Sequence, residues 1–172
     1  RGITLDDNEI ETIGSSTIVE TFGNVEMDGG GSITGNGELQ VGSGSTFTFN
    51  GGSVGVKISN NGIVIVNGDI GSGGNTFTGT GGSVEVNGPA DLDFSSYTLG
   101  PLTVDCAGVG VNFNGGNIDT RALAISGNSG CVVDMKLFNL NGVGNDITID
   151  DSTLRLTNSI TETVTPPITM TG

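Results

Sequence analysis

The chain has 172 residues, enough for one domain with a hydrophobic core, and its 32 glycines, single tyrosine and lack of tryptophan describe a turn-rich β protein. Residues that favour helices never gather at helical spacing, so we expect essentially no α-helix. Nineteen acidic against five basic residues give a net charge of −14, which argues against nucleic acids and anionic membrane surfaces as partners because both bind basic patches.

The first segment, residues 1–27, is acidic and matches the rest of the chain poorly. We expect it to form an N-terminal cap or an arm that docks on a partner. The chain begins with Arg1 rather than methionine, which we interpret as a processed protein or a piece of a longer one. No apolar stretch approaches the roughly 20 residues that span a bilayer, so we expect no membrane insertion.

The second segment, residues 28–158, contains a repeat of Asn-Gly dipeptides. A series of five begins at Asn36, Asn61, Asn87, Asn114 and Asn141, and its members follow one another at a nearly constant interval. A constant interval of about 26 residues is typical of stacked repeats. Because Asn and Gly tolerate the left-handed backbone of sharp bends, we interpret these five asparagines as corners that recur once per turn of a solenoid.

Short segments between these corners alternate apolar and polar residues, which is the pattern of a strand with one buried face. One such segment precedes each corner, at 31–35, 54–60, 82–86, 109–113 and 135–140, and the others are 38–41, 45–49, 63–66, 75–79, 91–94, 102–105, 122–126, 146–149 and 152–156. Three of them per unit predict an all-β fold: a single-stranded parallel β-helix of about six rungs with a repeat of ~26 residues. The competing interpretation takes Asn-Gly as hairpin turns of an antiparallel sandwich or barrel, which would not require a constant interval.

The two cysteines, Cys106 and Cys131, are separated by about one predicted repeat. They could therefore lie on the same face of adjacent rungs, about 4.8 Å apart, which is within the reach of a disulfide bond. A disulfide in an extracellular setting and a pair of stacked buried thiols both remain open.

Catalytic chemistry has few candidates, because the chain has no histidine and so no histidine-based triad, base or metal ligand. Sugar cleavage by paired carboxylates is the remaining option for a β-helix. Stacking at the predicted interval would place Asp93 beside Asp119, and Asp119 beside Asp146, with Arg121 as the nearest base. Residues 117–119 ("NID") and 150–151 ("DD") are similar to fragments of the polygalacturonase motifs, but Gly-His-Gly and Arg-Ile-Lys are absent. We expect no catalytic residues and no enzymatic activity.

One calcium motif follows the last of the five asparagines. "NGVGNDITI" (141–149) resembles the glycine-rich nonapeptide of calcium-binding β-rolls, which implies Gly142, Gly144 and Asp146 as ligands. It departs from that pattern at Asn141, and it stands alone, whereas such rolls bind the ion between consecutive repeats. We expect no cofactor, with calcium at this motif as the exception to test.

The last segment, residues 159–172, contains Pro166 and Pro167, which cannot donate to a strand ladder. We expect an exit segment that reaches toward another subunit or the remainder of a longer chain.

Two short motifs carry a family resemblance. Gly-Gly-Ser-Val (51–54 and 81–84) and Phe-x-x-Asn (47–50 and 138–141) resemble repeats of polymorphic membrane proteins and other autotransporter passengers, with serine in place of alanine. The glycine-, asparagine- and threonine-rich rungs with an acidic surface look equally like phage tail spikes and head appendages. The resemblance implies a β-helix surface protein that is extracellular, on a virion or a cell surface.

These observations predict a structural or attachment protein without enzymatic activity, for which a phage appendage, decoration or spike module is the first hypothesis. A secreted bacterial adhesin passenger is the alternative, and a carbohydrate-cleaving β-helix enzyme is the second alternative. The expected partners are copies of the same chain, for example in a trimer, and other virion or surface proteins. Glycans are a further candidate partner.

Overall fold

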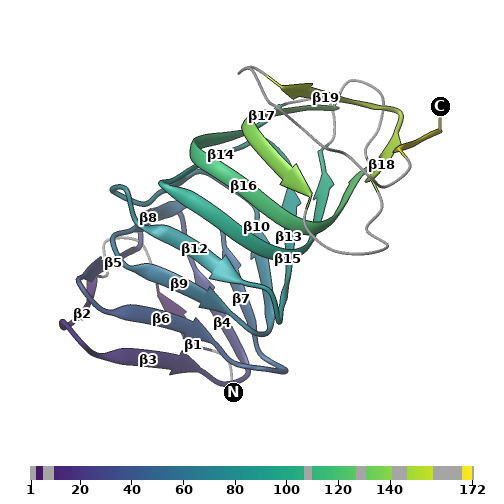
Figure 1. The fold of residues 1–172 in the computed structure, drawn as a ribbon. Helices are drawn as coiled ribbons and strands as arrows, with labels where there is room; N and C mark the ends of the chain where they lie inside the picture. Colours follow the sequence, from purple (N-terminus) through teal and green to yellow (C-terminus); the bar gives the residue numbers. More distant parts are fainter. Residues whose placement is uncertain are drawn as a thin grey trace.

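The computed structural model describes residues 3–5, 10–106, 110–126, 131–140, 147–156 and 168–171. The described residues form twenty strands and no helix, and the strands stack as a β-solenoid (Figure 1). All strand pairs are parallel, whereas hairpins would pair consecutive strands in antiparallel fashion. The prediction of an all-β parallel β-helix is therefore confirmed, and the alternative of an antiparallel sandwich is wrong.

The ladder divides the strands into three faces, since each strand from β1 to β12 pairs with the third strand after it. Face I contains β1 (Ile3–Leu5), β4 (Asn24–Met27), β7 (Thr46–Phe49), β10 (Ile63–Val66), β13 (Ser83–Asn87), β18 (Ile147–Asp150) and β20 (Ile168–Thr171). Face II contains β2 (Ile10–Ile13), β5 (Ser32–Gly35), β8 (Gly52–Val54), β11 (Ile70–Gly71), β14 (Ala90–Phe94) and β19 (Ser152–Leu156). Face III contains β3 (Ile18–Thr21), β6 (Glu38–Val41), β9 (Lys57–Asn60) and β12 (Thr76–Gly79).

Three longer strands continue around corners and belong to more than one face. They are β15 (Ser96–Asp105), β16 (Val111–Ser126) and β17 (Cys131–Leu140). The first half of β15 pairs with β12 on face III, and its second half pairs with β13 on face I. Six complete turns run from the start of β4 to the end of β17, while β1–β3 and β18–β20 extend the stack at its ends, so the predicted number of about six rungs is confirmed.

The length of the repeat differs from the prediction. Paired residues are between 17 positions apart, as for Thr46 and Ile63, and 24 positions apart, as for Leu123 and Ile147. The typical spacing is roughly 21 residues. The longer repeat that we predicted from the asparagine series is therefore wrong, and so is the assignment of one recurring corner to the five asparagines.

The regular series of asparagines has a different geometric cause. Asn36 lies between β5 and β6, Asn61 lies between β9 and β10, and Asn87 ends β13 before β14, so each lies one corner further around the solenoid than the one before. Asn114, within β16, pairs with Asp93 at the end of face II and returns to the corner of Asn36. The interval of the asparagine series thus equals one turn plus one side. Asn141 lies outside the described residues.

The core is a continuous apolar column inside the three faces. The strands of the complete turns alternate buried and outward residues, as in β14, where Ala90, Leu92 and Phe94 are buried and the two aspartates between them are exposed. Five phenylalanines and the tyrosine are the largest buried side chains: Phe47, Phe49, Phe77, Phe94, Phe113 and Tyr97. Tyr97 packs edge-on against Phe94 and Phe113, with ring centroids 5.6 Å apart in both pairs.

Glycine is required where face II turns into face III. Gly35 and Gly115 have φ of 116° and 104°, which residues with a side chain rarely adopt. A Cβ at either position would also collide with a backbone carbonyl of the preceding turn, that of Ile13 or Phe94. These corners therefore need glycine for both backbone conformation and close approach between turns.

The strand ladder extends on both sides of the predicted repeat region 28–158. Strands β1, β2 and β3 pair in register with β4, β5 and β6, and β20 pairs with β18. The described parts of the segments that we expected to be a cap and an exit therefore carry strands of the same solenoid.

Candidate functional site

The carboxylates predicted to meet lie on different faces. Asp93 projects from β14 on face II, and its partner on the next turn is Asn114. Asp119 is on face III, where it pairs with Thr98. One carboxylate oxygen of Asp119 is buried without a hydrogen-bond partner, whereas the side chain of Arg121 is exposed. The register therefore does not assemble the predicted pair, and Asp146 lies outside the described residues.

The acids on face II form a structural column instead. Asp69 Oδ1 accepts a hydrogen bond from the Asp91 backbone N–H at 2.8 Å, and Asp91 Oδ1 accepts one from Asn112 Nδ2 at 2.6 Å. Further along the same column, Asp134 lies 3.5 Å from the guanidinium of Arg155. Each contact joins one turn to the next, so these side chains link the rungs of the solenoid.

No metal site is evident in the described part of the chain. No group of three or more Asp, Glu, His or Cys side chains gathers there in a way that could hold a metal ion. The predicted calcium ligands Gly142, Gly144 and Asp146 lie outside the described residues. Ile147 and Ile149, which follow them in β18, are buried core residues.

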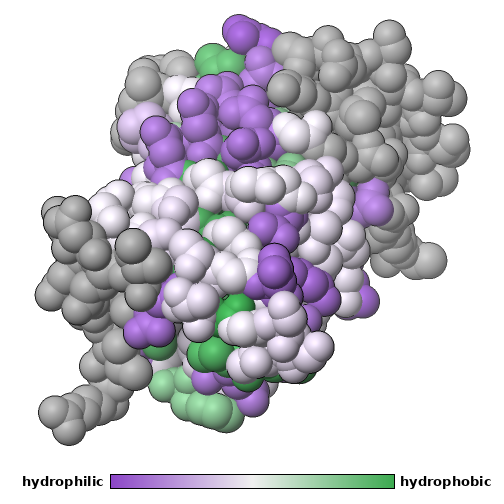
Figure 2. Space-filling view, turned by 90° about the vertical axis from the view of Figure 1, so that its left-hand side faces the viewer, coloured by the Kyte–Doolittle hydropathy of each residue, from purple (hydrophilic) through white to green (hydrophobic). Residues whose placement is uncertain are grey.

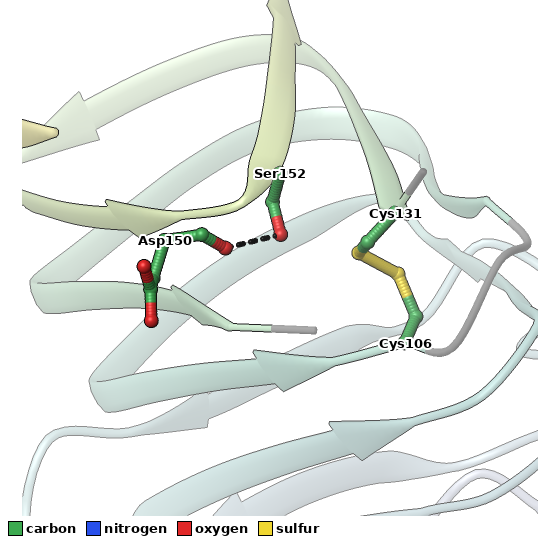
Figure 3. The surroundings of a disulfide bond; sticks show 4 residues. All are labelled: Cys106, Cys131, Asp150 and Ser152. Carbon is green, nitrogen blue, oxygen red and sulfur yellow. Dashed lines mark hydrogen bonds between the residues drawn. A yellow bond between two sulfur atoms is a disulfide. The ribbon is translucent and has the colours of Figure 1, made fainter. Parts of the chain in front are cut away.

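The two cysteines form a disulfide bond. Cys106 and Cys131 are both fully buried, and their Cα atoms are 5.3 Å apart (Figure 3). The bond joins consecutive turns at the corner between faces I and II, here called the I/II corner. On the following turn the same corner is tight: Asp151 has a positive φ of 44°, and Ser152 Oγ donates to the Asp150 carbonyl at 2.7 Å.

The I/II corner also carries a ladder of asparagine side chains. Asn87 Nδ2 donates to Asn67 Oδ1 at 3.2 Å, and Asn67 Nδ2 donates to Asn50 Oδ1 at 2.9 Å. The ladder ends on carboxylates, because Asn50 Nδ2 donates to Glu26 Oε1 at 2.6 Å and to Asp28 Oδ1 at 3.3 Å. The amides run head to tail, an arrangement in which each bond polarises the next and the terminal carboxylates strengthen it.

Sequence reasoning missed this ladder, because Asn50 and Asn67 were outside the regular series. The signal that could have found it is the spacing from Asn50 to Asn67 and from Asn67 to Asn87, which is close to one turn in both cases. Buried polar residues were also missed. Asn60, for example, is fully buried, where it donates to the Ser83 carbonyl and accepts from the Gly62 N–H, both at 2.9 Å.

The tyrosine hydroxyl is the described group with the most perturbed acidity. Tyr97 OH lies 2.8 Å from the Leu92 carbonyl and 2.9 Å from the Asn114 carbonyl, and it accepts a hydrogen bond from the Phe94 N–H at 3.1 Å. Burial raises the pKa of Tyr97 strongly, the Phe94 N–H lowers it somewhat, and the charge of Asp93 raises it further. The hydroxyl in its neutral form thus joins two consecutive turns, since Leu92, Phe94 and Tyr97 belong to one turn and Asn114 to the next.

The N-terminal end of the solenoid has an open cavity of about 430 Å³. Its apolar lining comes from side chains of the first turns: Ile13, Val19, Val25, Ile33, Leu39 and Phe47. Three large apolar residues of this end are exposed: Ile18 by 59%, Val19 by 42% and Phe22 by 75%. In Figure 2 apolar atoms gather at the lower end of the molecule, where the N-terminus lies in Figure 1.

A second depression of about 380 Å³ is polar and lies along face III. Its lining includes Asn36, Glu38, Lys57 and Asn75, and Lys57 Nζ lies 3.2 Å from Glu38 Oε2. The ion pair leaves the lysine partly neutralised, so the depression offers mixed hydrogen-bond donors and acceptors without a net charge of one sign.

The comparisons with known proteins give no family for this chain: no family model, no curated protein and no solved structure matches it. Among the described elements, no helix is long and apolar enough to cross a membrane.

Proposed function

We propose that the chain is a non-enzymatic structural and attachment module of a virion, such as a phage appendage, decoration or spike. The observation that carries this proposal is the bonded I/II corner. Asparagine amides link the turns from Asp28 to Asn87, and the disulfide links two later turns. A solenoid whose inner turns are bonded on both sides resists opening from its middle, which suits a stiff element for display outside the cell.

A secreted bacterial adhesin passenger is a second candidate, and the disulfide favours it. Disulfide bonds persist in secreted and surface proteins, whereas the cytoplasm in which phage particles assemble keeps thiols reduced. Both candidates place the mature protein outside the cell. They differ in whether the disulfide between Cys106 and Cys131 forms before or after the protein is incorporated into a larger assembly.

A carbohydrate-cleaving enzyme is the least supported candidate. Two carboxylates roughly 5–10 Å apart are required for this chemistry. Asp91 and Asp93 project from the same side of β14, but Asp91 already accepts a hydrogen bond from Asn112. We expect no release of reducing ends from a panel of polysaccharides. Release that an Asp91→Asn/Asp93→Asn variant abolishes would support the enzyme and contradict the structural proposal.

The expected partners are copies of the same chain, in a trimer, together with other virion or surface proteins, and glycans as an attachment target. Light scattering on the full chain tests this assembly. We expect a mass of about three times 17.2 kDa, unchanged by a calcium chelator. A monomer would contradict the assembled appendage and favour the adhesin passenger.

The chelator experiment needs a matched control for the predicted calcium motif. An Asp146→Asn variant removes the one charged ligand of that motif. If the chelator makes the wild-type protein less compact and leaves the compactness of Asp146→Asn unchanged, calcium binds at residues 141–149. If both proteins are indifferent to the chelator, the expectation of no cofactor stands.

A further inference from the structure

We propose that copies of this chain meet through face I, on a surface here called the face I patch. The patch consists of the outward residues within 46–49, 63–66, 83–86, 101–104, 121–125 and 147–149, one stretch from each of six successive turns. This inference rests on the proposed function, whose expected partners include copies of the chain, and it names the surface where the copies meet.

The patch is continuous along the side of the solenoid, because successive turns pair in register. Ile63 lies between Thr46 of the turn before and Ser83 of the turn after, if the pairing of β10 is followed in both directions. On later turns, Thr103 pairs with Ala124 in the same way. Figure 1 shows β7, β10 and β13 side by side in this part of the stack. Their outward side chains therefore form one surface.

The face I patch has almost no charge, although the chain has 19 acidic and five basic residues. Its six stretches contain one carboxylate, Glu85, and one cation, Arg121. Face II, by contrast, exposes Asp91 and Asp93 on a single strand. Like charges that face each other across an interface cost free energy, so two copies with a net charge of −14 associate best where carboxylates are few.

The middle of the patch is apolar on its outward side. Ile63 is 44% exposed, Ile65 is partly exposed, and Pro101 is exposed on a later turn. Strand β10 thus departs from the alternation of apolar inward and polar outward residues that a sheet with one face in water has. Exposed apolar residues that adjoin one another mark surfaces that bind another molecule.

The two charges of the patch favour a second copy as that molecule. Glu85 and Arg121 are both exposed, and neither forms an ion pair among the described residues. In a contact between two identical patches every interaction occurs twice, so Arg121 of each copy can lie beside Glu85 of the other. A partner that is only acidic or only basic would match one of these charges and oppose the other.

The area of the patch fits a small interface between proteins. Six turns at about 4.8 Å are about 29 Å tall, and a width of about six residues at about 3.3 Å each is about 20 Å. The resulting area of about 580 Å² per copy, or about 1,150 Å² for two copies, exceeds the roughly 1,000 Å² that a specific contact needs and belongs to weak complexes. The association should therefore depend on protein concentration.

The test measures the mass of the full chain by light scattering over a range of concentrations. Ile63→Ser removes the apolar centre of the patch, and Arg121→Glu reverses its cation. Arg121→Glu/Glu85→Arg exchanges the two charges, so that each patch again carries one of each sign. The control is Thr153→Glu, which adds a carboxylate at an exposed position of β19 on face II. Circular dichroism checks that every variant folds.

Ile63→Ser and Arg121→Glu should each weaken the association about 10-fold, whereas Thr153→Glu should leave it within about 2-fold of wild type. The exchanged variant should regain the wild-type association, because its charges match again between copies. An association that is indifferent to Ile63→Ser and Arg121→Glu, or that Thr153→Glu weakens equally, would overturn the proposal. So would an exchanged variant that associates no better than Arg121→Glu.

Cross-linking locates the contact without depending on a loss of association. A short bis-maleimide should join two copies of Thr103→Cys, whose new thiol lies in the patch, and leave Thr153→Cys as single chains. The reverse result would place the contact on face II and contradict the proposal.

The same measurements separate this inference from the proposed function. A trimer whose mass the face I variants leave unchanged would contradict the inference and leave the assembled appendage standing. An assembly of another mass that these variants dissociate would support the inference and contradict the trimer. A wild-type protein that is monomeric at every concentration would contradict both.

Discussion

Removing the disulfide bond is the perturbation whose cost can best be calculated. The bond between Cys106 and Cys131 closes a loop of 25 residues. In the chain-entropy model, the loss of such a cross-link raises the entropy of the unfolded state by about 12 cal/mol/K, which lowers the free energy of unfolding by about 3.5 kcal/mol at 25 °C. Because both cysteines are fully buried, a Cys106→Ala/Cys131→Ala variant also loses packing, which adds about 1–2 kcal/mol.

Urea unfolding of three samples separates the two contributions. Oxidised wild type, reduced wild type and Cys106→Ala/Cys131→Ala are followed by far-UV circular dichroism and by tyrosine fluorescence. Tyr97 is the single tyrosine, and no tryptophan obscures it. We expect reduced wild type to lie about 3.5 kcal/mol below oxidised wild type, and the alanine variant to lie lower still by its packing loss.

Two results would refute this reasoning. If the oxidised and reduced proteins unfold at the same urea concentration, the cross-link does not constrain the unfolded chain. If the purified wild-type protein retains two free thiols under non-reducing conditions, the disulfide is not formed, and the argument from it toward an oxidising compartment is lost.

Three smaller changes test the packing of the turns. Tyr97→Phe leaves the Phe94 N–H without its hydroxyl acceptor and should lower the free energy of unfolding by about 1–3 kcal/mol. Because burial raises the pKa of Tyr97 above its ordinary value of 10.0, the free energy of unfolding of the wild type should also fall as the pH rises above that value. Urea titrations at several pH values should find this fall in the wild type and not in Tyr97→Phe. Gly115→Ala should cost at least about 2 kcal/mol in the same unfolding assay, whereas Gly44→Ala, also at positive φ but in open space, should cost less; equal losses would show that the collision with the preceding turn is unimportant. Thr21→Val should leave the free energy of unfolding unchanged or raise it by up to about 1–3 kcal/mol, because the hydroxyl it removes is buried without a partner, and a lower free energy of unfolding would show that a partner exists.

The strands themselves could be predicted from the sequence, because the alternation that defines them is local. Residues 38–41 and 63–66 were predicted as strands, and β6 and β10 have those bounds. Within a strand, neighbouring side chains point to opposite sides, so a half-buried sheet imposes its pattern on any four consecutive residues. The all-β class followed from the density of such segments and the lack of helix formers, whereas the parallel class was inferred from the constant interval of the asparagine series.

The register between successive turns could not be predicted, because it depends on the lengths of corners that vary. The corner between β7 and β8 spans Asn50 and Gly51, whereas the one between β4 and β5 spans residues 28–31. Because the number of residues per turn varies from 17 to 24, equivalent positions of successive turns do not recur at a constant interval in the sequence. The asparagine series, whose interval is one turn plus one side, is regular by coincidence. The same error led to the prediction that Asp93 lies beside Asp119, whereas the register pairs Asp93 with Asn114 and Asp119 with Thr98.

In the first turn, the pairing register of the strands shows the position of polar residues that the amino-acid composition does not. Along the sequence, Glu11 and Thr21 belong to an acidic segment that was expected to be a separate cap or arm. In the ladder they stand at the inward positions where the next turn has Ile33 and Val41. The acidic character of this segment therefore extends into the end of the core, where the carboxylate and the unpartnered hydroxyl border an apolar cavity.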